Sequence, residues 1–171
     1  MRTNTTDQTI LPPGSPAPRF SLPDSSHSRL SLDDLDGGPV VLVFHVADWH
    51  PVADEQLLQI EQLRPVIEGL GASVVAISVD ATWSHDAYAR AWGLGFPLLA
   101  DDAPIAAVAS AYGVYASETG RSRRALVVID RLGIVRWSAV FPDALAPGVE
   151  GILDTLEGLR TAPTDPDPPI G

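Results

Sequence analysis

The stretch VFHVADWHPVADEQLLQIEQL, residues 43–63, joins the end of an apolar run to the start of an amphipathic pattern. Residues 40–44 are apolar at every position, which predicts a strand that is buried on both faces. Over residues 52–70 the apolar side chains recur at three- and four-residue spacing, which predicts an amphipathic helix. Pro65 lies inside this pattern and predicts a kink or a break into two helices. The polar loop between strand and helix is therefore a candidate position for a reactive side chain.

The rest of the chain alternates strand patterns with helix patterns. Strands are predicted at residues 73–79, 96–99, 125–129 and 134–140, and helices at residues 82–92, 105–111 and 149–159, with a single helical turn at 31–35. Thr82 or Ser84 is the predicted cap of the helix at 82–92. Residues 130–133, DRLG, carry a hairpin signal. This order predicts a layered α/β domain with a mixed sheet.

The sequence predicts one domain, at residues 11–160, between two tails. Residues 1–10 are polar and predict a flexible N-terminal tail. Residues 161–171, TAPTDPDPPIG, are rich in proline and aspartate and predict a disordered C-terminal tail. No segment between them has the composition of a linker.

The composition excludes several classes of function. The 171-residue chain has a net charge of −11, and all 11 of its basic residues are arginine. Binding to a nucleic-acid backbone or to an anionic membrane surface needs clustered positive charge, so neither partner is expected. No run approaches the roughly 20 apolar residues of a membrane span. The N-terminus carries no long apolar segment, and a cytoplasmic protein is expected.

Several phrases, in order and with plausible spacing over roughly residues 11–160, resemble the peroxiredoxins (the alkyl hydroperoxide reductase/thiol-specific antioxidant family). They include GSPAPRFSLPD at 14–24, LSLDDLDGGPVVLVF at 30–44 and VVAISVDATWSHDAYAR at 74–90, followed by FPLLADD, AYGVY and RALVVIDRLGIVRW. The resemblance implies a thioredoxin-like fold of peroxiredoxin type, with a mixed central β-sheet flanked by helices.

The catalytic loop of that family reads P-x-x-x-T/S-x-x-C, and its cysteine thiolate attacks the peroxide. On this sequence the proline falls on Val46, the hydroxyl residue on His50 and the cysteine on Ala53. The family's arginine, which stabilises the thiolate and the transition state, falls on Arg124 and is retained. The resemblance thus implies a catalytic site that has kept its arginine and lost its nucleophile.

Asp48, Trp49 and Pro51 resemble the loop of one bacterial branch, which often reads A-D-W-S-P-V-C. With Val46 and Arg124 they are the residues that the resemblance places around the ligand. Trp49 is expected at the mouth of the pocket or in a dimer contact.

Ala53 decides the chemistry of the loop, because a methyl group cannot attack a peroxide. The chain contains no cysteine, and its one methionine is Met1. Thiol peroxidase activity is therefore excluded for this sequence. An active enzyme trapped by an engineered Cys→Ala change is the alternative, but one engineered change would leave Val46 and His50 as proline and threonine or serine.

The loop keeps electrostatic devices that suit an anion. A helix N-terminus and Arg124 both favour a negatively charged oxygen, and His50 could act as a general base or donate a hydrogen bond to it. In the competing interpretation Arg124 pairs with Asp48, Asp54 or Glu55 and closes the corner.

His45, His50 and Asp48 offer the residue types of a metal site, since imidazole and carboxylate suit zinc or iron. The spacing matches no metal-binding motif, so neither a metal nor a cofactor is predicted. His85 is expected to be a surface or packed histidine.

Three hypotheses for the function follow. The first is a binding or regulatory pseudoenzyme that forms a homodimer, or pairs with an active paralogue, across the face beside the loop, as peroxiredoxins commonly do. The second is a repurposed non-redox enzyme that uses His50 and Arg124 on a substrate bearing an oxyanion. The third is the trapped thiol peroxidase.

Overall fold

The computed structural model describes residues 9–35, 37–142 and 149–161, and its centre is a five-stranded sheet in the order β5-β4-β3-β8-β9. The described strands are β1 (Ser21–Pro23), β2 (Arg29–Ser31), β3 (Val40–Phe44), β4 (Ser73–Ser78), β5 (Leu98–Ala100), β6 (Tyr115–Ala116), β7 (Arg121–Ser122), β8 (Ala125–Ile129) and β9 (Val135–Val140). β3 runs parallel to β4 and antiparallel to β8, so the sheet is mixed, as predicted. The hairpin predicted at residues 130–133 joins β8 to β9.

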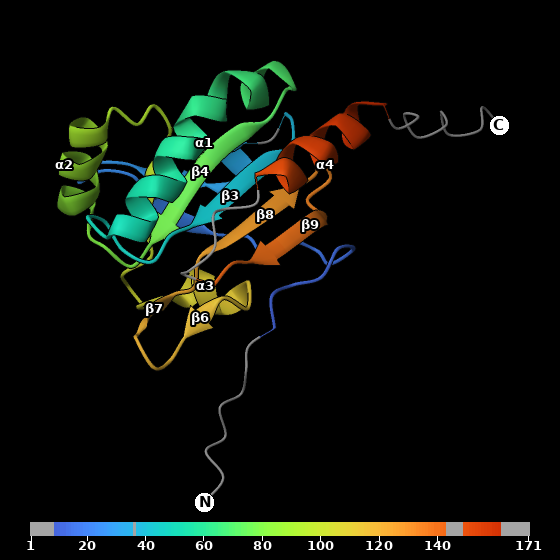
Figure 1. The fold of residues 1–171 in the computed structure, drawn as a ribbon. Coiled ribbons are helices and arrows are strands. Elements are labelled where there is room, and N and C mark those ends of the chain that lie inside the picture. Colours follow the sequence, from blue (N-terminus) through green and yellow to red (C-terminus); the bar gives the residue numbers. More distant parts are fainter. Residues whose placement is uncertain (1–8, 36, 143–148, 162–171) are drawn as a thin grey trace, which may run out of the picture.

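Helices cover both faces of this sheet (Figure 1). The described helices are α1 (Pro51–Gly69), α2 (Thr82–Trp92), α3 (Ala107–Ala111), α4 (Glu150–Thr161) and the 3-10 turn η1 (Leu32–Leu35). In Figure 1, α1 and α4 lie above the sheet, while α3 lies below it beside β6 and β7. The predicted layered α/β architecture with a mixed sheet is confirmed.

The alternation of side chains along β3 explains why both faces are covered. Val41 and Val43 join one hydrophobic cluster, which includes Leu57 and Ile60 of α1 and Leu156 of α4. The intervening residues of β3 join a second cluster on the other face, with side chains from β1, η1 and α3: Val40, Leu42, Phe44, Leu22, Leu32 and Val108. Because side chains of a strand point alternately to opposite faces, the continuous apolar run requires two cores.

The register of β3 places several polar residues at one edge of the sheet. Phe44 pairs with Ile77 of parallel β4 and with Ala125 of antiparallel β8. The residues that follow β3 and β4 therefore leave the sheet at the same edge, and Arg124, which precedes β8, lies at that edge too. In open α/β sheets the carboxyl ends of parallel strands are the usual location of a binding site.

Two local predictions need correction. Helix α1 continues through Pro65 as one helix, so the break into two helices is not found. The N-cap of α2 is Ala81, which makes no side-chain cap hydrogen bond, so neither Thr82 nor Ser84 caps this helix. Ser84 instead donates its hydroxyl hydrogen to a carboxylate of the site described below.

The predicted tails, residues 1–10 and 161–171, lie largely outside the described residues. Ile10 and Leu11 pack against the core, and the backbone N–H of Leu11 donates to the carbonyl of Tyr112. Within the described part of the chain, no helix combines the length and the apolar character needed to cross a membrane.

Candidate functional site

The loop after β3 forms the corner that the sequence indicates. His50 is the N-cap of α1, and its Nδ1 accepts a hydrogen bond of 3.2 Å from the backbone N–H of Val52. Pro51 stands at the start of the helix, where its missing N–H is not needed. Ala53 is fully buried, with an exposed fraction of 0%. The predicted nucleophile position is thus a covered methyl group within the first turn of α1.

The arginine of the predicted site is buried at the same edge of the sheet. Arg124 is 2% exposed, and its Nη2 donates a hydrogen bond of 2.6 Å to the carbonyl of Pro142. Two of the carboxylates that the sequence offers as its partners are engaged elsewhere. Asp54 accepts a hydrogen bond of 2.6 Å from the hydroxyl of Tyr88, and Asp48 lies in a histidine cluster.

That cluster consists of His45, Asp48 and His85. Nε2 of His45 lies 2.9 Å from Oδ1 of Asp48, and Nδ1 of His85 lies 2.8 Å from Oδ2 of the same carboxylate. The two rings are tilted with centroids 5.8 Å apart. All three side chains are buried, which is costly for ionisable groups unless they satisfy one another.

Neighbouring groups hold the Asp48 carboxylate and its loop in place. The hydroxyl of Ser84, in α2, donates a hydrogen bond of 2.9 Å to Oδ2 of Asp48. The backbone N–H of Asp48 donates to Oδ2 of Asp80, which also accepts from the hydroxyl of Ser78. On the far side of the second imidazole, Nε2 of His85 lies 3.1 Å from the carbonyl oxygen of Leu99. The site is thus built from the loop after β3, the end of β4, α2 and β5.

The electrostatic environment favours an ionised carboxylate at the centre. Burial raises the pKa of Asp48, but hydrogen bonds from His45 and His85, together with their charges, outweigh burial and hold this pKa far below its usual range. Burial lowers the pKa of His45, and the nearby carboxylates only partly offset that effect. Nδ1 of His45 is buried without a hydrogen-bond partner among the described residues.

The pKa of His45 in the folded chain lies below its ordinary value of 6.5. As the pH falls, His45 is therefore protonated in the unfolded chain before it is protonated in the folded chain. This contribution to stability is present above about pH 6.5 and is lost below it, at up to about 1.4 kcal/mol per pH unit. We expect the free energy of unfolding of His45→Phe to fall less steeply than that of the wild type between pH 8 and pH 5. Urea titrations followed by tryptophan fluorescence, with a chelator present, measure the two slopes. Equal slopes would contradict the assignment of this proton to His45.

Two site predictions can be compared with this geometry. Among the described residues, one group could share a metal ion, and it consists of His45, Asp48 and His85. The trio that the sequence offered had His50 in place of His85. His85 is 2% exposed, so of the surface and packed positions expected for it the structure shows the packed one. Its proximity to Asp48 has no signal in local spacing, because 37 residues separate the two.

Gln56 is a buried polar residue that the sequence did not indicate. Both polar atoms of its amide lack a hydrogen-bond partner among the described residues.

Trp49 occupies an unusual backbone conformation at the outer side of the cluster. Its φ of 64° is left-handed, which costs a bulky residue roughly 1–2 kcal/mol. The indole is 53% exposed, and its ring meets Tyr88 edge-on at a centroid distance of 5.1 Å. The loop therefore directs an aromatic side chain outward while Asp48, next to it, points inward.

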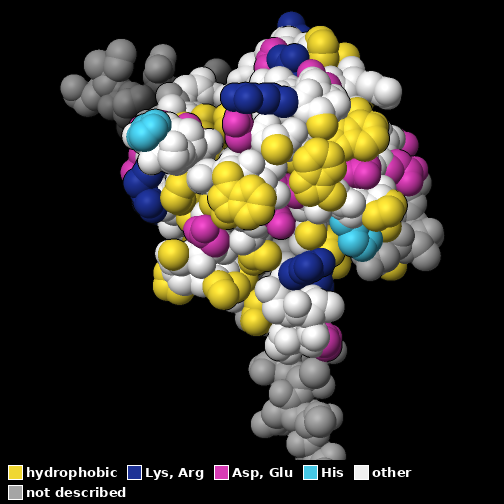
Figure 2. Space-filling view, turned by 90° about the vertical axis from the view of Figure 1, so that its left-hand side faces the viewer, with side chains coloured by type: hydrophobic (Ala, Val, Ile, Leu, Met, Phe, Trp, Pro, Cys, Tyr) yellow, Lys and Arg dark blue, Asp and Glu magenta, His cyan; other side chains and the backbone are white. Residues whose placement is uncertain are grey.

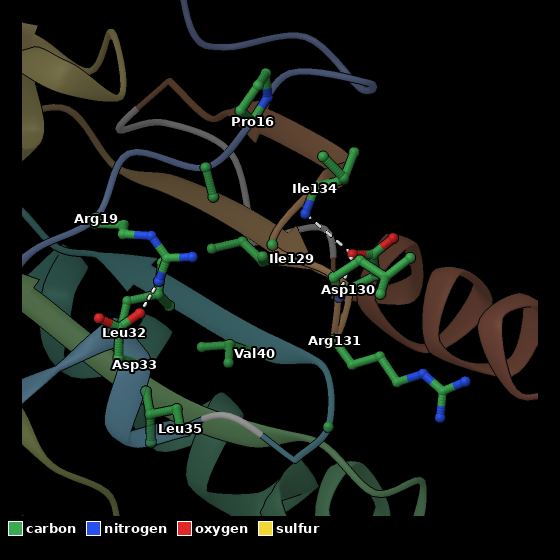
Figure 3. Close-up of a pocket in the computed structure, with 14 residues that line it drawn as sticks. Pro16, Arg19, Leu32, Asp33, Leu35, Val40, Ile129, Asp130, Arg131 and Ile134 are labelled. Carbon is green, nitrogen blue, oxygen red and sulfur yellow. Dashed lines mark hydrogen bonds and ion pairs between the residues drawn. The ribbon is translucent and has the colours of Figure 1, made fainter.

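A separate pocket lies at the other end of β3 (Figure 3). It is lined by Val40 at the start of β3 and by Ile129 at the end of β8, and Arg19 forms an ion pair with Asp33 at its side. Because Val40 and Phe44 stand at opposite ends of one strand, this pocket is distinct from the histidine cluster.

Comparison with known proteins decides the family. The model of the AhpC/TSA family matches residues 13–138. The chain belongs to this family. Alkyl hydroperoxide reductase E of Mycobacterium tuberculosis is 34% identical over 130 residues, which cover 75% of this chain and 85% of the relative. A peroxiredoxin of Thermoplasma volcanium is 26% identical over 153 residues, covering 86% of this chain and 74% of the relative.

Solved structures of peroxiredoxins share the fold. Peroxidoxin BcpB of Mycobacterium tuberculosis superposes with a TM-score of 0.78 at 27% identity, over 87% of this chain and 98% of that one. AhpC of Mycobacterium tuberculosis gives a TM-score of 0.78 at 19% identity, over 90% and 95% of the two chains. The resemblance read from the sequence is confirmed, and the family member described here has no cysteine.

Proposed function

We propose that this peroxiredoxin-like protein does not reduce peroxides by thiol chemistry and functions as a binding partner, first of all for a second copy of itself. The observation that carries the proposal is Ala53, a fully buried methyl group at the position that the family resemblance assigns to the reactive cysteine. A cytoplasmic location and a regulatory role belong to the same proposal.

The structural roles of the remaining loop residues support it. His50 uses Nδ1 to cap α1, and Arg124 is buried with a hydrogen bond to the carbonyl of Pro142. Each of these contacts stabilises the corner in the absence of substrate. The repurposed-enzyme hypothesis needs both residues for a substrate, and these contacts favour the binding role over it.

An exposed aromatic surface beside the loop supports self-association. Trp49 is 53% exposed and Trp83 is 78% exposed. Trp49 directly follows Asp48 and Trp83 directly precedes Ser84, and the hydrogen bond between Asp48 and Ser84 joins the loop to α2 at these positions. Figure 2 shows hydrophobic side chains gathered across the face that contains α2. Large exposed aromatic residues are characteristic anchors of protein interfaces.

Peroxide consumption tests the loss of thiol chemistry. With dithiothreitol as reductant, the wild type is expected to consume hydrogen peroxide no faster than buffer, because the chain has no thiol. Ala53→Cys is expected to react no faster than Ser26→Cys, since a side chain at position 53 is covered whereas Ser26 is exposed. Stopped-flow measurement of peroxide loss compares the three proteins. Turnover by the wild type would overturn the proposal, and a much faster reaction of Ala53→Cys than of Ser26→Cys would favour the trapped thiol peroxidase instead.

A further inference from the structure

We propose that His45, Asp48 and His85 form a binding site for one divalent first-row transition-metal ion of the zinc type. This inference is independent of the proposed function, because it concerns the polar cluster beside the loop and not the position of Ala53. The ligand atoms would be Nε2 of His45, Nδ1 of His85 and the carboxylate oxygens of Asp48.

The separations between these atoms match those of ligands around a single ion. With metal–ligand distances of about 2.0–2.2 Å, neighbouring ligand atoms in a tetrahedral or octahedral shell lie about 3 Å apart. The two nitrogen–oxygen distances to Asp48 are 2.9 Å and 2.8 Å, and all three ligand atoms lie within 4.8 Å of one another. Small side-chain adjustments would therefore suffice to accept an ion.

The surroundings of His85 supply the second argument. One ring nitrogen faces the carbonyl of Leu99 and the other faces the carboxylate of Asp48, and both of these partners are acceptors. A neutral imidazole carries one N–H, so it can donate to one partner only. With Nε2–H donating to Leu99, Nδ1 can coordinate a cation that the carboxylate also binds. Coordination would then replace the direct hydrogen bond between Nδ1 and Asp48.

The contacts around the cluster resemble those that orient metal ligands. A histidine that binds a metal through one nitrogen usually donates its other N–H to a carbonyl or carboxylate, which fixes the ring, and Leu99 offers such a carbonyl to His85. Ligating carboxylates are in turn hydrogen-bonded, as Asp48 is by Ser84. Nδ1 of His45 is buried without a partner among the described residues, so this ring is oriented by the contact of its Nε2 with Asp48.

The donor set selects the class of ion. Two imidazoles and one carboxylate suit Zn²⁺, Fe²⁺, Co²⁺ or Ni²⁺, whereas Mg²⁺ and Ca²⁺ prefer oxygen ligands. Three protein ligands leave at least one coordination position for a further ligand. Since His45 is 0% and His85 is 2% exposed, the ion would enter when the chain folds or when the loop opens.

The test measures metal stoichiometry directly. Chelator-treated protein is refolded from guanidinium with an excess of Zn²⁺ or Co²⁺, dialysed, and analysed for metal content. We expect about one ion per chain, visible absorption bands from bound Co²⁺, and a thermal unfolding midpoint several degrees higher with Zn²⁺ than with chelator.

Variants assign the ligands. His85→Ala and Asp48→Asn are expected to lose bound Co²⁺ and its absorption. His27→Ala is the matched control, since His27 is exposed and outside the cluster, and it should keep one ion. His50→Ala should also keep it, which distinguishes this cluster from a trio that includes His50. Circular dichroism confirms that each variant is folded.

Two outcomes would overturn the proposal. One is wild-type protein that retains less than about a tenth of an ion per chain after refolding with either metal, which would leave the cluster as a hydrogen-bonded triad. The other is full stoichiometry in folded His85→Ala. If His85→Ala does not fold, the side-chain NMR signals of the wild type decide, because bound Zn²⁺ must shift the ring signals of His45 and His85 together.

Discussion

Replacement of Asp48 by alanine is expected to lower the free energy of unfolding by about 3–5 kcal/mol, which is typical when one partner of a buried ion pair is removed. The carboxylate is the common partner of His45, His85 and Ser84, and all three would lose it at once. Two buried imidazoles and a serine hydroxyl would then be left without their shared hydrogen-bond acceptor. Urea unfolding followed by tryptophan fluorescence, in buffer that contains a chelator, measures the change.

Asp86→Ala is the matched control for this substitution. Asp86 follows His85 in α2, but its side chain is exposed and pairs with Arg90 on the helix surface. Surface ion pairs contribute little, so a change within about 0.5 kcal/mol is expected. A loss below about 1 kcal/mol in Asp48→Ala would show that the cluster is not a stabilising element of the fold, since a buried partner normally costs more.

The fold was predictable because its signals are local. The uninterrupted apolar run of β3 requires cover on both faces, and the structure provides it with α1 and α4 on one side and α3 on the other. The bounds of α2 match the predicted residues 82–92, although the predicted cap was wrong. Pro65 did not break α1, because tertiary packing of Ile60 and Ile67 on either side of it holds the helix together.

The histidine cluster was not predictable, because it depends on contacts between distant segments. Asp48 and His85 are 37 residues apart, and they meet because β3 and β4 run parallel in a fixed register and α2 returns over their carboxyl ends. Ser84 illustrates the same limit. Its position near a helix start favours a cap, in which its oxygen would accept from a backbone N–H, but in the structure its hydroxyl donates to the buried carboxylate of Asp48.

Ala53 and the cluster of His45, Asp48 and His85 occupy different parts of the corner between β3 and α1. Ala53 points into the covered start of α1, while His45 and Asp48 leave β3 toward α2. The loss of a thiol at one position therefore does not remove polar chemistry from this edge of the sheet. It also leaves Trp49, directly between Asp48 and His50, as the part of the loop that is presented to solvent.

Substitution of Trp49 by aspartate is expected to weaken self-association by at least about 30-fold, the effect of losing an aromatic anchor worth about 2 kcal/mol. Aspartate tolerates the left-handed φ of 64° at this position better than most residues, so the loop itself should fold normally. Trp83→Asp should act in the same direction, since Trp83 is the most exposed of the tryptophans in the described residues. Sedimentation equilibrium over a range of protein concentrations measures the dissociation constants.

Trp92→Asp is the control for these variants. Trp92 is 38% exposed but stands at the far end of α2, nine residues after Trp83 and therefore on the opposite side of the helix. Its substitution should leave the dissociation constant within about threefold of the wild type, as expected for a surface position outside an interface. If the wild type sediments as a monomer at all accessible concentrations, the second copy is not the partner. If Trp92→Asp dissociates the dimer as strongly as Trp49→Asp does, the interface is not centred on Trp49. Either it lies elsewhere on α2, or the added negative charge weakens any contact between two chains that each carry a net charge of −11.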